Sequence, residues 1–135
     1  MAARKKFMYL NRHAPHGTIY GHEGLEVVLV GAAFDQDVSM AFIGDGVFQL
    51  KKEQNTSAIE TKNFSAAYRA LKDYDVTRLY VELESLTERG LTSEDLMPLT
   101  YEDEDDDYKE KSAIQLIDRA SLGKLLEAQN VILNF

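Results

Sequence analysis

All three histidines of the chain lie in one short segment, where their side chains could do chemistry. His13, His16 and His22 fall close together, with Glu23 directly after the last of them. Three imidazoles supply enough nitrogen ligands for a zinc ion, but this spacing within a loop is not a recognised zinc-ligand pattern. We therefore predict no metal site. The other interpretation is that the histidines cap, form hydrogen bonds or line a subunit contact.

Glycines alternate with these histidines at Gly17, Gly21 and Gly24. A helix expected to begin near Glu23 would point its free N–H groups at this segment, which is the geometry of an anion site. The glycine spacing matches neither the dinucleotide fingerprint nor the phosphate-binding loop, since no Gly-Lys-Ser/Thr closes it. A stand-alone domain that binds an anion or nucleotide stays an alternative, and no cofactor or cofactor-binding residue is assigned.

The chain has no cysteine among its 135 residues. This excludes disulfides, thiolate metal sites, cysteine catalysis and any persulfide carried on the chain itself. A serine hydrolase is also disfavoured, because no G-x-S-x-G nucleophile elbow is present. The sequence therefore predicts no catalytic residue.

A second segment of interest, Gly44–Leu50 (GDGVFQL), follows an expected strand. Its Gly-Asp-Gly start permits a tight turn, and Val47, Phe48 and Leu50 then place apolar side chains in a connection. Two interpretations stay open: the segment folds back on the core, or it forms a subunit contact. The C-terminal Phe135 raises the same question.

The net charge of −8 is distributed unevenly. Residues 1–67 balance their acidic and basic side chains, so the excess lies in residues 68–135, much of it between Glu102 and Glu110. An acidic face repels phosphate backbones, so we expect no direct nucleic-acid contact. No glycine lies between Leu91 and Leu122, which rules out the calcium-loop signature. We expect residues 102–110 to form a solvated loop.

Short apolar runs predict five strands. They are Lys6–Asn11, Val38–Ile43, Arg78–Leu83, Ala113–Ile117 and Val131–Phe135. None approaches the length of a membrane span, and the N-terminus lacks a signal core, so a cytoplasmic location is expected.

Helical periodicity separates several of these strands. It covers Leu25–Ala33, Phe64–Leu71 with Asn63 as the cap, and Leu122–Leu126. A helical turn at Leu91–Leu96 is the one element expected between Ser85 and Lys111, the rest being loop. Alternating strands and helices favour a three-layer α/β/α fold with a mostly parallel five-stranded sheet, in one domain spanning residues 1–135.

Several separated segments together resemble the DsrF/TusC family of sulfur-relay subunits, within the DsrE-like superfamily. The segments are Ala14–Thr18, Glu23–Glu26, Asp45–Leu50 and Asn130–Phe135. Three more look closer to the DsrF type of sulfur-oxidising bacteria than to the TusC type: Lys5–Arg12, Gly31–Val38 and Lys62–Ser65.

The resemblance implies a DsrE-like fold and a heterohexamer with DsrE-like and DsrH-like subunits. In such a complex a cysteine of the DsrE-type subunit passes persulfide sulfur to a DsrC-like or TusE-like acceptor. A cysteine-free chain would then be a non-catalytic subunit of a sulfurtransferase complex. Its histidine segment could add positive charge near a partner's thiolate, and its acidic segment could steer a basic partner. The alternative within the family is the TusC-type role in transfer-RNA 2-thiouridine synthesis.

Overall fold

The computed structural model describes residues 5–12, 37–50, 76–96 and 99–134. The strands are β1 (Lys6–Asn11), β2 (Asp37–Phe42), β3 (Leu79–Glu82), β4 (Thr100–Asp103), β5 (Lys109–Ser112), β6 (Ile114–Ile117) and β7 (Val131–Asn134). The helices are α3 (Leu83–Glu88) and α4 (Arg119–Glu127), with 3₁₀ helices η1 (Gly44–Leu50), η4 (Ser93–Asp95) and η5 (Glu104–Asp106).

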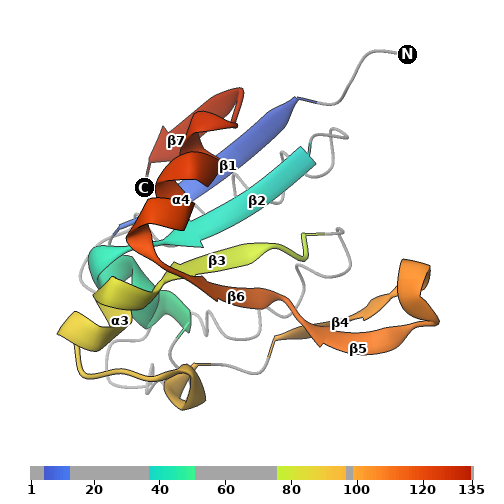
Figure 1. Ribbon diagram of the computed structural model, residues 1–135, viewed down its shortest axis with the longest axis horizontal. Coiled ribbons are helices and arrows are strands. Elements are labelled where there is room, and N and C mark those ends of the chain that lie inside the picture. Colours follow the sequence, from blue (N-terminus) through green and yellow to red (C-terminus); the bar gives the residue numbers. More distant parts are fainter. Residues whose placement is uncertain (1–4, 13–36, 51–75, 97–98, 135) are drawn as a thin grey trace, which may run out of the picture.

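Five of these strands form one sheet in the order β6-β3-β2-β1-β7 (Figure 1). Every neighbouring pair is parallel, with Phe7 of β1 opposite Val38 on one side and Val131 on the other. All five strands predicted from the apolar runs are present, displaced by at most one residue at either end. The prediction of a mostly parallel five-stranded sheet is confirmed.

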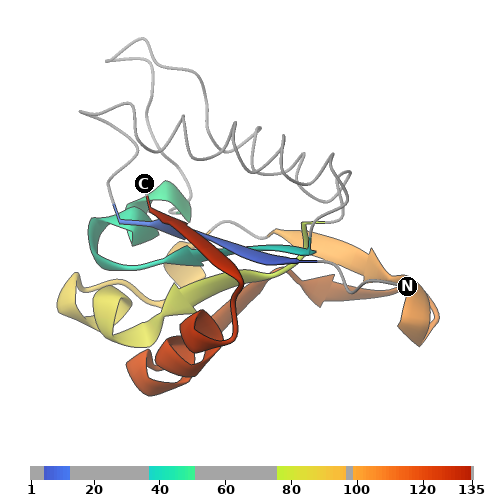
Figure 2. The same ribbon diagram turned by 90° about the horizontal axis from the view of Figure 1, so that it is seen from above.

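Alternation of side chains along the central strands separates two clusters of buried residues. Met8, Leu10 and Ala41 pack with Leu122 of α4, and Figure 2 shows α4 against this face of the sheet. The opposite face carries the larger cluster, built from the sheet and from the segments that follow β2 and β3. Its members include Tyr9, Met40, Phe42, Val81, Val47, Leu50, Leu86, Leu96 and Leu99. Strands buried on both faces read as continuous apolar runs, which is why the sequence reveals them.

A capping side chain fixes the start of helix α4, and leucines at helical spacing form its buried face. The Asp118 carboxylate accepts a hydrogen bond from the Ser121 N–H at 2.7 Å and caps the first turn. Hydrogen bonding to Ser121 lowers the pKa of Asp118. Leu122, Leu125 and Leu126 follow at the spacing of one helical face and pack on the sheet. The predicted helix at Leu122–Leu126 is confirmed and begins one turn earlier.

The stretch from Ser85 to Lys111 is more structured than expected. The predicted helical turn at Leu91–Leu96 is present as η4, held by a capping box between Thr92 and Asp95. Helix α3 was not predicted, because six residues are too few to show a helical period.

The expectation of a loop at residues 102–110 is wrong. Strands β4 and β5 pair as an antiparallel hairpin, closed by η5 and by two residues with positive φ, Asp107 and Tyr108. The Asp103 side chain accepts the Asp105 N–H at 3.0 Å, and Lys111 pairs with Asp103 at 2.6 Å. These local bonds hold a hairpin whose strands carry mostly charged side chains, so no apolar alternation marks them in the sequence.

Other predicted features lie outside the described residues. They are the helices Leu25–Ala33 and Phe64–Leu71 with Asn63, the segment holding His13, His16 and His22, and Phe135. Within the described ranges, no helix combines the length and apolar character needed to cross a membrane.

Candidate functional site at the carboxyl edge of the sheet

The carboxyl ends of β1, β2, β3 and β6 lie at the same edge of the sheet. In open parallel sheets this is the edge where ligands gather. The described residues that follow these ends come from η1, from α3 and from the start of α4. Two groups of polar contacts lie here, one around Asn11 and Gly46 and the other around Glu82.

Asn11, the last residue of β1, is fully buried. Its Nδ2 group donates to the carbonyl oxygens of Tyr9 at 3.1 Å and Ala41 at 3.4 Å. Its backbone carbonyl accepts the Ile43 N–H at 3.0 Å. Gly46 packs directly on that carbonyl, so a Cβ at this position would lie 2.0 Å from the Asn11 oxygen. The end of β1 is therefore locked against the first turn of η1.

The burial of the apolar side chains of η1 decides whether Gly44–Leu50 folds back on the core or forms a subunit contact. Val47 and Leu50 are fully buried in the larger core cluster, and Phe48 is half-buried. Gly44 has a φ of +53°, which a glycine adopts without strain. The interpretation that this segment folds back on the core is confirmed for Val47 and Leu50.

A chain of hydrogen bonds links the ends of β2 and β3. The Gly44 N–H donates to Ser85 Oγ at 2.8 Å, and the Ser85 hydroxyl donates to Glu82 Oε1 at 2.6 Å. Glu82 and Ser85 are both buried. Arg119, at the start of α4, donates to the same Glu82 oxygen at 3.0 Å and to Glu88 at 3.3 Å. Through Ser85 and Arg119, the Glu82 carboxylate thus links α3 with η1 and α4, two segments that are distant from it in the sequence.

Two opposing effects act on the pKa of the Glu82 carboxyl. Burial alone would raise it, but hydrogen bonds from Arg119 and Ser85, together with the positive charges of Arg119 and Arg89, lower it overall. The hydrogen bond and charge of Glu82, together with the hydrogen bond to Glu88, raise the pKa of Arg119. Glu82 is therefore ionised at neutral pH and has no tendency to act there as a general acid.

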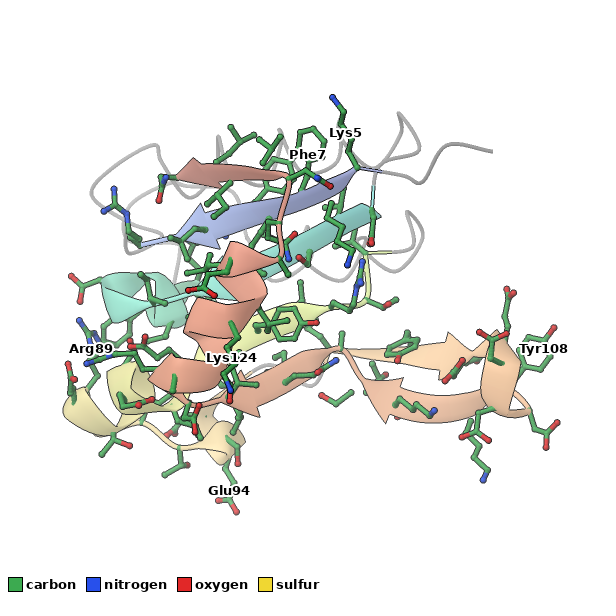
Figure 3. The ribbon with its side chains drawn as sticks, turned by 45° about the horizontal axis from the view of Figure 1, so that its top comes forward. Lys5, Phe7, Arg89, Glu94, Tyr108 and Lys124 are labelled. Atoms are coloured by element: carbon green, nitrogen blue, oxygen red, sulfur yellow. The ribbon has the colours of Figure 1, made fainter. Side chains whose placement is uncertain are left out.

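Arg89, labelled in Figure 3, directly follows α3 and extends this network. Its Nε donates to Asp45 of η1 at 3.0 Å, and its Nη1 donates to the Ser85 carbonyl at 3.1 Å. Asp45 belongs to the Gly-Asp-Gly turn noted in the sequence, whereas Glu82, Ser85, Arg89 and Arg119 were not predicted to belong to a site. A usable signal was present, because Glu82 is a charged residue at the end of an apolar strand.

The described side chains of this edge serve binding and support. The Ser85 hydroxyl is buried and engaged at both its oxygen and its proton, so it is not placed to attack a substrate. No group of three or more acidic or histidine side chains that could hold a metal occurs among residues 5–12, 37–50, 76–96 and 99–134. The described part of the edge acts as a scaffold that fixes η1, α3 and α4 together.

The β4–β5 hairpin carries its own ion-pair network. Lys111 contacts Asp103 at 2.6 Å and Asp106 at 3.1 Å, while Lys109 lies 3.8 Å from Asp106. Hydrogen bonding to Asp103 and Asp106 raises the pKa of Lys111. The hydrogen bond from Lys111 and that from the Asp105 N–H lower the pKa of Asp103.

We expect Lys111→Gln to loosen the hairpin, because it removes both short ion pairs. Hydrogen exchange at the amide of Tyr108, which donates to the Asp103 carbonyl at 2.9 Å, should become faster. Lys109→Gln is the control, since it loses only one long, exposed contact. The protection that Lys111 confers should also fade as the pH falls through the lowered pKa of Asp103. Equal exchange in the two variants would contradict this account.

The chain matches one family model and is similar in sequence to proteins of known name. A family model described as the DsrE/DsrF-like family matches residues 5–135. The intracellular sulfur oxidation protein DsrF of Allochromatium vinosum is 50% identical over 131 residues, covering 97% of this chain and 96% of that protein. A TusC homolog of Vibrio vulnificus is 43% identical over 89 residues, covering 66% of this chain and 75% of that protein.

The fold has a solved counterpart. The crystal structure of the ychN protein from E. coli superposes with a TM-score of 0.72 at 16% identity, covering 98% of this chain and all of that one. At this identity the likeness concerns the fold alone. It agrees with the three-layer α/β/α architecture expected from the sequence.

Proposed function

Because this chain belongs to the DsrE/DsrF-like family, we propose that it is a non-catalytic subunit of a cytoplasmic sulfur-relay complex. The relay serves intracellular sulfur oxidation, and residues 1–135 act in it as one domain. The observation that carries the proposal is the 50% identity to DsrF over nearly the whole of both chains. The resemblance found in the sequence alone leads to the same family.

The chemistry of the chain supports a role without catalysis. A persulfide requires a thiol, and this chain has no cysteine. The sulfur atoms it does have are methionine thioethers, which cannot carry a persulfide. The reactive cysteine must therefore lie on another subunit, for which a DsrE-like chain is the candidate, with a DsrH-like chain completing a heterohexamer. A DsrC-like protein would accept the sulfur.

The described carboxyl edge fits this assignment. Its buried serine and carboxylate join η1, α3 and α4, so neither of the two is free to act as a nucleophile. Such a scaffold can hold a fixed outer surface against neighbouring subunits. The same properties fit a TusC-type subunit of a transfer-RNA thiolation relay, which the TusC relatives support over a smaller part of the chain.

Native mass spectrometry of the chain purified from its own host with a mild tag tests the proposal. We expect an assembly of two copies each of this chain and two other small subunits, at least one of which has a reactive cysteine. Persulfide labelling should then modify the partner and leave this chain unlabelled. Sulfur transfer to a DsrC-like rather than a TusE-like acceptor separates sulfur oxidation from transfer-RNA thiolation. Recovery of the chain alone with a bound anion or nucleotide would overturn the proposal.

A further inference from the structure

The β4–β5 hairpin projects away from the five-stranded sheet, as Figures 1 and 2 show. It is anchored at its base, where the Ala113 N–H donates to the Leu99 carbonyl at 2.9 Å and both residues are buried. Beyond Tyr101, which packs on the core, the strands pair only with one another in the described structure. A two-stranded ribbon of this kind is marginal in water by itself, so local bonds must hold its shape.

The two faces of the hairpin differ in charge balance. On one face, Asp103 stands opposite Lys109, and Lys111 reaches Asp103. On the other face, Glu102 stands directly opposite Glu110, and both are exposed. No basic side chain of the described residues forms an ion pair with either glutamate. This face therefore carries negative charge that no described cation compensates. Like charges directly opposite one another across a strand pair also destabilise a hairpin.

The tip of the hairpin presents an aromatic side chain to solvent. Tyr108 is 65% exposed, and Figure 3 shows it at the far end of the hairpin. The backbone that carries Tyr108 is held by the bond from its N–H to the Asp103 carbonyl and by the cap that Asp103 provides to η5. Exposed tyrosines held in place in this way are frequent anchors of protein interfaces, because ordering them costs little entropy.

The alternatives to a protein partner fit this surface less well. The hairpin carboxylates do not converge into a group that could hold a metal ion. Nucleic acid would be repelled by the same charges. A second copy of the chain would bring together two molecules that each have a net charge of −8. A basic protein surface would supply the missing countercharges and a contact for the tyrosine.

We propose that the β4–β5 hairpin is a docking arm whose Glu102–Glu110 face and Tyr108 tip bind a lysine- and arginine-rich surface of a partner protein. This deepens the proposed function, on which it rests, by naming the face of this subunit that meets its partner. Electrostatic attraction steers the encounter, and Tyr108 provides the anchor.

Zero-length carboxylate–amine cross-linking of the assembly purified from its host tests this directly. We expect cross-linked peptides that join Glu102 or Glu110 to a lysine of another protein in the assembly. Cross-links only to lysines of the same chain, cross-links between two copies, or none at all in an intact assembly would overturn the docking arm while leaving the subunit role standing. Failure to recover any assembly would count against both.

Charge variants then measure the contribution of the face to binding of the cross-linked partner, produced and purified separately. The double change Glu102→Lys with Glu110→Lys keeps two like charges opposed, so hairpin stability is matched while the face changes sign. We expect binding to weaken on the order of tenfold at low salt and by less at high salt. Glu94→Lys, on an exposed residue of η4 outside the hairpin, is the control and should bind as the parent does.

The single change Glu102→Lys separates docking from hairpin stability. It places a lysine opposite Glu110, so the hairpin should become more stable while partner binding becomes weaker. Tyr108→Ala should weaken binding at least tenfold at every salt concentration, because the anchor is apolar. Binding unchanged in both Glu102→Lys and Tyr108→Ala would overturn the proposal.

Discussion

Replacing Gly46 with alanine should destabilise the fold by about 3 kcal/mol or more. The added Cβ would lie 2.0 Å from the Asn11 carbonyl oxygen and 2.6 Å from its carbon, distances that real side chains do not show. Neither backbone can move freely, because the Asn11 carbonyl is bonded to Ile43 and the Gly46 N–H to the Ile43 carbonyl. Since domains are stable by only about 5–15 kcal/mol, the loss would be a large share of the total.

Urea unfolding followed by circular dichroism gives the free energy of unfolding for this comparison. Gly123→Ala is the matched control, because a Cβ at Gly123 meets nothing within 4 Å. Alanine in a helix interior should raise the free energy of unfolding by about 0.5–1 kcal/mol relative to glycine. The two Gly-to-Ala changes should therefore act in opposite directions. A Gly46→Ala protein within about 0.5 kcal/mol of the parent would show that η1 does not pack on β1 as described.

The central sheet could be predicted from the sequence because parallel strands buried on both faces leave a local signature. Phe7–Leu10 and Ala41–Ile43 are nearly continuous apolar runs, and the two strands that they predict lie within one residue of the expected bounds. The same reasoning located Leu122–Leu126, whose leucines share one helical face. Patterns with a period of two or 3.6 residues carry this information within a few neighbouring positions.

The hairpin and the Glu82 network left no comparable signature. Strands β4 and β5 are stabilised by charged side chains, so their sequence reads as a solvated run. The Glu82–Arg119 contact joins residues 37 positions apart, and periodicity says nothing about such pairs. The sequence does allow one inference about Glu82: a carboxylate at the end of an apolar strand needs partners, because a buried charge is costly without them.

Replacing Glu82 with glutamine should cost about 2 kcal/mol at pH 7, because the charged hydrogen bonds to Arg119 and Ser85 become neutral ones. Glutamine keeps the size of the side chain, so the core remains filled. The control is Glu94→Gln, on an exposed residue that Figure 3 shows pointing away from the protein. We expect Glu94→Gln to stay within about 0.5 kcal/mol of the parent in the same urea titration.

The cost of Glu82→Gln should depend on pH in a defined direction. The folded state lowers the pKa of Glu82, so its ionised form stabilises the fold above the unfolded value of about 4.3. That contribution disappears as the pH falls through the lower folded pKa. The difference between parent and variant should therefore shrink as the pH is lowered from 7 towards 3. A difference that stays constant over this range would mean that Glu82 is not ionised in the folded protein.

Removing Arg119 should reverse the effect of the Glu82 substitution. In an Arg119→Met protein, burial still raises the pKa of Glu82, while the hydrogen bond and the charge that lower it most are gone. Burial is the largest of these effects, so we expect it to outweigh the Ser85 hydrogen bond and the Arg89 charge that remain and to raise the folded pKa of Glu82. A carboxylate with a raised folded pKa destabilises the fold as it ionises, so this variant should lose stability between about pH 4 and 7. Adding Glu82→Gln should then be neutral or stabilising at pH 7, although it destabilises the parent. If Glu82→Gln costs the same in both backgrounds, Arg119 is not the residue that keeps this buried carboxylate ionised.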